Sequence, residues 1–235
     1  MTSAGVLSLP QPTGLSARLR KWGAGRSIMR LVRRLIDAAV ETYLRIDTTG
    51  NTADRGGGVH GDSNHYEPLD YPLLRKCLKA MELNADDVVY EIGCGMGRPL
   101  ALFARRRIAK CIGVELSESL ADRAKENMRT LRGRRAGSVE VWATDAVCVD
   151  YSDGTAFYIF NSFGPTTLAA VLDRIRAGTI QRPRPIRIIY VNPMHEDVFS
   201  AAPWLRLTKR VRSKLFRMQA SVWVSDDKNL EPAPL

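Results

Sequence analysis

The most constraining feature of the chain is a strand that runs into three alternate glycines and is followed by a second strand ending on an acid. The first strand reads Val-Val-Tyr-Glu-Ile over residues 88–92, and the glycines are Gly93, Gly95 and Gly97. Glycine adopts positive φ readily and, lacking Cβ, lets backbone N–H groups approach a ligand closely. The second strand ends at Glu115, where a carboxylate can accept both hydroxyls of a ribose. The pattern therefore indicates a strand-to-helix turn that holds a nucleoside cofactor.

The spacing of the glycines discriminates between cofactors. A dinucleotide fingerprint, G-x-G-x-x-G, needs a glycine at position 98, where this chain has Arg98. The run from Glu91 to Gly97, E-x-G-x-G-x-G, instead resembles the first motif of the class I, seven-strand S-adenosylmethionine (SAM) methyltransferases. The resemblance implies that Glu91 and the glycines hold the amino-acid part of SAM and that Glu115 binds its ribose. A glycine-rich turn without a ligand is the alternative.

The resemblance extends to the end of the third expected strand. Asp145 stands where the family binds the adenine amine, and Ala146 where it makes a backbone contact. Asp is also a common loop cap, which is the alternative for Asp145. The cofactor-binding residues implied by the resemblance are Glu91, Gly93, Cys94, Gly95, Gly97, Glu115, Leu116, Asp145, Ala146 and Asn161.

Two segments carry the expected acceptor site. Asn161-Ser162-Phe163-Gly164 follows the fourth expected strand, and it is closer to the Asn-Asn-Phe of the histone-type enzymes than to Asn-Pro-Pro-Tyr. Tyr66-Glu67-Pro68 matches a segment that covers the methionine end of SAM in seven-strand lysine methyltransferases; an ordinary helix entry is the alternative. The resemblance therefore implies a catalytic set of Asn161, Phe163, Tyr66 and Glu67. His195 and Glu196, after the fifth expected strand, are further titratable candidates.

The order of the expected elements indicates the fold class. Apolar strands at 88–92, 111–116, 139–144, 156–161 and 186–191 alternate with helices, which predicts a parallel sheet with helices on both faces. Two alternating runs after Pro203 predict a closing antiparallel hairpin. We therefore expect an α/β, Rossmann-like seven-strand methyltransferase sheet preceded by a basic helix. The expected divisions are a basic arm and helix (1–47), a glycine-rich linker or lid (48–63), the methyltransferase domain (64–225) and a tail (226–235).

Positive charge is concentrated near the N-terminus. Seven basic residues and no acidic one lie between Met1 and Ile36, in a chain whose formal net charge is +10. Apolar residues from Ile28 to Tyr43 recur at helical spacing between arginines, which predicts a basic amphipathic helix. Three interpretations stay open: a helix packed on the domain, contact with an anionic surface through residues 18–34, and an organelle transit peptide.

Composition limits the classes of protein and of site that fit this sequence. The four cysteines are far apart with no metal-ligand spacing, so we expect reduced thiols, no structural metal and no disulfide. No run of 18 apolar residues exists, so we expect a soluble, cytoplasmic protein. The expected function is methyl transfer from SAM to a nucleophilic acceptor, with a protein lysine favoured. The alternatives are a small-molecule, lipid or RNA acceptor, a SAM-binding regulator without chemistry, and an NAD(P)-dependent oxidoreductase, which Arg98 and the hairpin disfavour. The acceptor and the oligomeric state stay open.

Overall fold

The computed structural model describes residues 31–49, 69–213 and 218–226 of the 235-residue chain. The contacts divide the chain into two units, Met1–Val40 and Glu41–Leu235. A helix over residues 31–44 begins in the first unit and ends in the second. Tyr66, Glu67 and most of the expected linker lie outside the described residues, and the division expected at residue 47 stays a prediction.

The second unit is built on one seven-stranded sheet with the strand order β3-β2-β1-β4-β5-β7-β6. Strands β1 to β5 are parallel, and β7 is antiparallel to both of its neighbours, β5 and β6. This confirms the expected fold, including the closing hairpin. The strands are β1 (Val88–Ile92), β2 (Lys110–Glu115), β3 (Ser138–Ala143), β4 (Ala156–Phe160), β5 (Arg187–Val191), β6 (Leu205–Arg212) and β7 (Gln219–Ser225).

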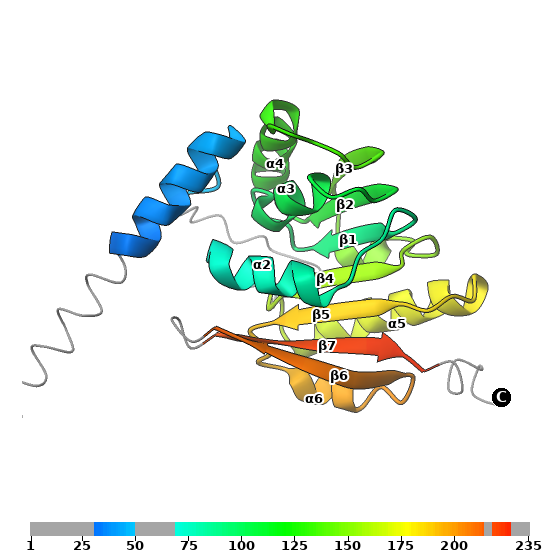
Figure 1. Ribbon diagram of the computed structural model, residues 1–235. Coiled ribbons are helices and arrows are strands. Elements are labelled where there is room, and N and C mark those ends of the chain that lie inside the picture. The colour runs from blue at the N-terminus through cyan, green and yellow to red at the C-terminus, as the bar shows by residue number, and fades with distance from the viewer. Residues whose placement is uncertain (1–30, 50–68, 214–217, 227–235) are drawn as a thin grey trace, which may run out of the picture. The chain divides into compact units, whose positions relative to one another are not determined.

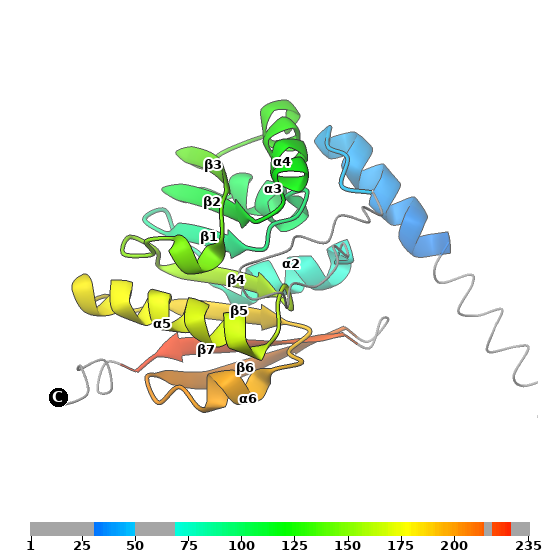
Figure 2. The same ribbon diagram turned by 180° about the vertical axis from the view of Figure 1, so that it is seen from behind.

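Helices cover both faces of the sheet, with α2, α3 and α4 on one face and α5 and α6 on the other (Figures 1 and 2). Their starts follow from the sequence: the carboxylate of Asp70 caps α2 and the hydroxyl of Ser117 caps α4. The helices are α2 (Tyr71–Ala80), α3 (Arg98–Ala104), α4 (Glu118–Thr130), α5 (Pro165–Gln181) and α6 (Glu196–Ser200), with a 3-10 turn at Ala146–Cys148. The helix that follows the glycines, α3, ends at Ala104.

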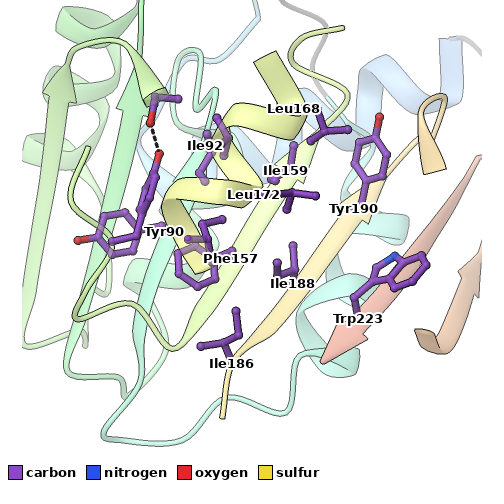
Figure 3. Close-up of a cluster of buried hydrophobic side chains, with 14 of the residues drawn as sticks. Tyr90, Ile92, Phe157, Ile159, Leu168, Leu172, Ile186, Ile188, Tyr190 and Trp223 are labelled. Carbon is purple, nitrogen blue, oxygen red and sulfur yellow. Dashed lines mark hydrogen bonds between the residues drawn. The ribbon is translucent and has the colours of Figure 1, made fainter. Parts of the chain in front are cut away.

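The strands alternate their side chains between two cores. Tyr90, Phe157 and Tyr190 belong to a buried cluster that packs against Leu168 and Leu172 of α5, as Figure 3 shows. Because strand side chains alternate, Glu91 points to the opposite face, toward α3. The sheet thus positions the ends of β1, β2, β4 and β5 rigidly, and the candidate site is built on those ends.

The described residues contain neither a membrane-spanning helix nor a cluster of metal ligands. No described helix is long and apolar enough to cross a membrane. Within the described part of the chain, no three His, Cys, Asp or Glu side chains are grouped so that they could hold a metal ion. All four cysteines are unpaired; three are buried and Cys148 is exposed.

Candidate functional site

The three glycines form a tight turn that ties the end of β1 to the end of β2. Gly93, Gly95 and Gly97 have φ values of 75°, 52° and 81°, a region that strains other residues. The amides of Gly93 and Cys94 both donate to the carbonyl of Val114, at 2.8 and 3.0 Å. The turn therefore needs glycine for its backbone conformation, as the sequence predicted.

Glu115 is held at the end of β2 by the same turn. Its Oε2 accepts a hydrogen bond from the amide of Gly95 at 2.8 Å, and its Oε1 accepts one from the amide of Ser117 at 3.0 Å. The residue is only partly buried, and each oxygen of a carboxylate can accept more than one hydrogen bond. A fixed, partly exposed carboxylate beside a glycine turn fits the ribose of SAM. Leu116, the next residue, is also partly exposed.

Glu91 lies beneath the turn rather than in it. The residue is 2% exposed, its carboxylate accepts a hydrogen bond from the amide of Leu100 in α3, and its Oε2 has no partner in the described chain. Burial raises the pKa of Glu91 well above its usual value, the charge of Glu115 raises it further, and the bond from Leu100 opposes the shift. Glu91 therefore supports the start of α3 from the core side, and its contact with SAM stays a prediction.

Asp145 follows β3 and caps the short turn after it. Its Oδ1 accepts a hydrogen bond from the amide of Val147 at 3.1 Å, so the capping role considered from sequence is present. Ala146 is 9% exposed, and its carbonyl accepts a hydrogen bond from the hydroxyl of Tyr151 at 2.9 Å. These contacts fix the end of β3, and the adenine contact remains a prediction.

The ends of β4 and β5 meet in a chain of hydrogen bonds. The amide of His195 donates to the hydroxyl of Tyr190, which donates to Oδ1 of Asn161, both at 3.3 Å. Asn161 and Asn192, which follow β4 and β5, have φ values of 37° and 50°, and positive φ is uncommon outside glycine. Burial raises the pKa of Tyr190, so its hydroxyl stays a donor. Sequence reasoning missed Tyr190 because a tyrosine in an apolar strand is typical of a core.

The other residues predicted after β4 and β5 make contacts within the fold. Phe163 is 6% exposed and packs in the core cluster with Leu168, so its place in the catalytic set stays a prediction. Glu196 forms an ion pair with Arg210 of β6 at 2.9 Å. Ser162, between Asn161 and Phe163, donates to the carbonyl of Ile92 at 3.1 Å and so joins β4 to the glycine turn.

Arg98 is the largest departure from expectation. Its guanidinium, 1% exposed, donates to Oγ1 of Thr48 at 2.7 Å, to the carbonyl of Leu69 at 2.9 Å and to Oε1 of Glu41 at 2.8 Å. It also lies over the ring of Tyr71, 4.8 Å from the centroid. In the sequence, Arg98 only argued against a dinucleotide-binding pattern. In the structure, it is a buried cation that ties residues 41–48 to the first turn of α3.

Asn127 of α4 makes a second tie to the same segment. Its Nδ2 donates to the carbonyls of Asp47 and Met96, both at 2.8 Å, and its Oδ1 accepts from the amide of Asp47 at 2.8 Å. Met96 lies inside the glycine turn. Residues 41–49 are therefore fastened to the turn from two sides, through Arg98 and through Asn127.

The comparisons with known proteins agree with this geometry. Residues 89–177 match the family described as a methyltransferase domain. A protein-lysine N-methyltransferase of Saccharolobus islandicus is 27% identical over 96 residues, which are 40% of this chain and 58% of that protein. The fold is similar to that of an RNA methyltransferase from Salinibacter ruber solved with S-adenosyl-L-homocysteine (TM-score 0.53, 20% identity, 72% of this chain and 97% of the other). It is also similar to that of a SAM-dependent methyltransferase from Aquifex aeolicus (TM-score 0.50, 14% identity, 65% of this chain and 89% of the other).

Proposed function

We propose that this chain, which carries a class I SAM-dependent methyltransferase domain, transfers a methyl group from SAM to the side-chain amine of a protein lysine. The observation that carries the proposal is the glycine turn with Glu115 fixed beside it by the amide of Gly95. The turn and the acid occur on the first two strands of a sheet with the methyltransferase order, within the matched residues 89–177.

The residues at the strand ends fit SAM and have separate tasks. The glycine turn offers backbone groups without side-chain obstruction, and Glu115 offers carboxylate oxygens for the ribose hydroxyls. When bound, SAM supplies a methyl group on a sulfonium, and the attacking nitrogen displaces a neutral thioether. The protein's contribution is then to bind, orient and exclude water, because in-line displacement depends chiefly on alignment.

A lysine acceptor must present a lone pair. Its amine has an ordinary pKa of about 10.4, so it has to lose its proton before it attacks. An amide oxygen is suited to accept a hydrogen bond from such an amine and to orient it. Asn161 provides that oxygen, and Tyr190 and the amide of His195 hold it in place. The lysine methyltransferase of S. islandicus supports this acceptor.

Binding and labelling experiments test the two halves of the proposal. Calorimetry should show SAM binding to the wild type and none to Gly95→Arg or Glu115→Ala; unchanged affinity in both variants would refute the cofactor assignment. Tritiated SAM and a cell extract, separated into protein, RNA and lipid fractions, test the acceptor. Label on protein lysines is expected. SAM binding without label in any fraction would favour a regulator, and label on RNA or lipid alone would overturn the lysine assignment.

A pair of matched tyrosine variants tests the acceptor site. Tyr190→Phe removes the hydroxyl that orients Asn161, so we expect kcat to fall roughly tenfold with SAM affinity unchanged. Tyr158→Phe is the control, because the hydroxyl of Tyr158 is buried on the other face of the sheet and has no hydrogen-bond partner in the described residues. Equal activity of both variants would contradict an orienting role for Tyr190.

A further inference from the structure

Six arginines gather where α3 and α4 end. Three follow α3 directly, at positions 105–107, and three lie in the loop after α4, at 132, 134 and 135. The two loops are hydrogen bonded to each other, since the amide of Arg135 donates to the carbonyl of Ala104 at 2.8 Å and the amide of Gly137 donates to that of Ile108 at 3.0 Å. We call these six residues the arginine cluster: Arg105, Arg106, Arg107, Arg132, Arg134 and Arg135.

Two members of the cluster are held on one aromatic ring. The guanidinium of Arg132 lies 4.8 Å, and that of Arg105 lies 5.6 Å, from the ring centroid of Tyr43. Arg105 also donates to the carbonyl of Arg132. Tyr43 is 54% exposed, so the two cations are fixed beside each other at the surface. Cations in contact with an aromatic ring gain from its quadrupole, but the two still repel each other.

The described residues supply no counter-charge to the cluster. None of its six guanidiniums forms an ion pair within residues 31–49, 69–213 and 218–226. Glu140 of β3 pairs with Lys110, and Asp47 pairs with Arg123, so neither carboxylate is paired with the cluster. The cluster is therefore a concentrated positive surface that the described fold leaves unneutralised.

The cluster lies away from the candidate site. It directly precedes the N-terminal ends of β2 and β3, whereas the glycine turn and Glu115 lie at the carboxyl ends of β1 and β2. The 13 residues of α4 separate the two regions along the chain, a helix length of roughly 20 Å. A partner bound at the cluster would leave the carboxyl ends of the strands accessible to an acceptor.

We propose that the arginine cluster binds the backbone of a single-stranded nucleic acid. Guanidinium groups match phosphate oxygens in planar, two-pronged hydrogen bonds, and all six side chains are Arg rather than Lys. Flat guanidinium planes also stack on unpaired bases. Successive phosphates on a strand supply the repeated negative charge that six adjacent cations require.

An anionic membrane fits the cluster less well. Surfaces that lie on a bilayer insert apolar side chains alongside their cations. Among the described residues of the second unit, the exposed large apolar side chains are Tyr43, Ile180 and Met194, and of these Tyr43 contacts the cluster. The loops themselves present arginine, glycine and alanine around the cluster.

A charge-reversal experiment tests the proposal with the full chain. A fluorescein-labelled oligouridylate serves as the probe, and anisotropy measures its affinity over a range of salt concentrations. The test variant is Arg106→Glu/Arg107→Glu/Arg134→Glu. The matched control is Arg206→Glu/Lys209→Glu/Arg212→Glu, whose exposed side chains lie on β6 at the far end of the sheet order. Both triple variants change the net charge equally.

The expected result separates a local site from general attraction. The test variant should bind the oligouridylate roughly tenfold more weakly or worse, and its salt slope should fall by about 2 for three lost phosphate contacts. The control should bind within about twofold of the wild type. Equal weakening in both variants, or wild-type binding to phosphatidylserine vesicles but not to the oligouridylate, would overturn the proposal. Unchanged melting temperatures and SAM affinity in both variants exclude misfolding as the cause.

Discussion

Replacing Glu41 by alanine should destabilise the protein strongly. The carboxylate of Glu41 pairs with Arg98 at 2.8 Å, and the two side chains are only 6% and 1% exposed. Without Glu41, the guanidinium stays buried and loses this carboxylate, while its bonds to the neutral oxygens of Thr48 and Leu69 remain. Breaking a buried ion pair by removing one partner costs about 3–5 kcal/mol. At this chain length the loss corresponds to a melting temperature lower by roughly 10 °C.

Thermal unfolding followed by circular dichroism measures this loss of stability. Two further variants test whether the loss arises from the buried charge of Arg98. Glu126→Ala removes an acid from the exposed pair with Arg129 and should leave the melting temperature unchanged. Glu41→Leu combined with Arg98→Met removes both charges, and its loss should be much smaller than that of Glu41→Ala. If Glu41→Ala costs less than about 1 kcal/mol, and the double variant is no better, the buried charge of Arg98 does not need Glu41 and the reasoning is wrong.

Three further outcomes follow from single positions. A Cβ added in Gly93→Ala would lie 2.2 Å from Oγ of Ser162 at a φ of +75°, so SAM affinity measured by calorimetry should fall at least roughly tenfold; an unchanged affinity would show that the turn can shift. The pKa of Glu91 is raised, so the folded state retains a proton above pH 4.5 and wild-type stability declines as pH rises from there toward that raised pKa. The melting temperature of Glu91→Gln, measured from about pH 5 to about pH 8, should not show this decline. If the melting temperatures of the variant and the wild type change with pH in parallel, Glu91 is not the cause of the decline. Cys148 alone among the four cysteines is exposed, so Ellman's reagent should label one thiol quickly; burial raises the pKa of Cys77 to about 12, and a second fast thiol would contradict the described packing.

The sheet was predictable because its signals are local. Strand β1 has the bounds expected from its apolar residues, and β2 and β3 begin one residue earlier than expected. Alternation of apolar and polar residues after Pro203 predicted the hairpin, since period two is visible over a few residues. The sequence did not predict the short α6, at Glu196–Ser200, because five residues carry too little periodicity.

The candidate site was predictable only where a motif defined it. The glycine turn and Glu115 come together as expected. The hydrogen bond between Arg98 and Glu41 joins residues 57 positions apart, and a local sequence pattern cannot predict such a pairing. Tyr190 was hidden for a related reason: its ring packs in the core, and only its hydroxyl reaches Asn161.

The place of β7 in the sheet has a consequence during synthesis. Strand β7 lies between β5 and β6, although β6 precedes it in the chain. Until residues 219–225 have emerged from the ribosome, β5 keeps an open edge that includes Ile188 and Ile189, and β6 has no strand to pair with. Open apolar edges recruit other strands, so the nascent chain should be most prone to aggregation, and most dependent on chaperones, in that interval. Insertion of β7 between β5 and β6 pairs it with both strands and closes the edge.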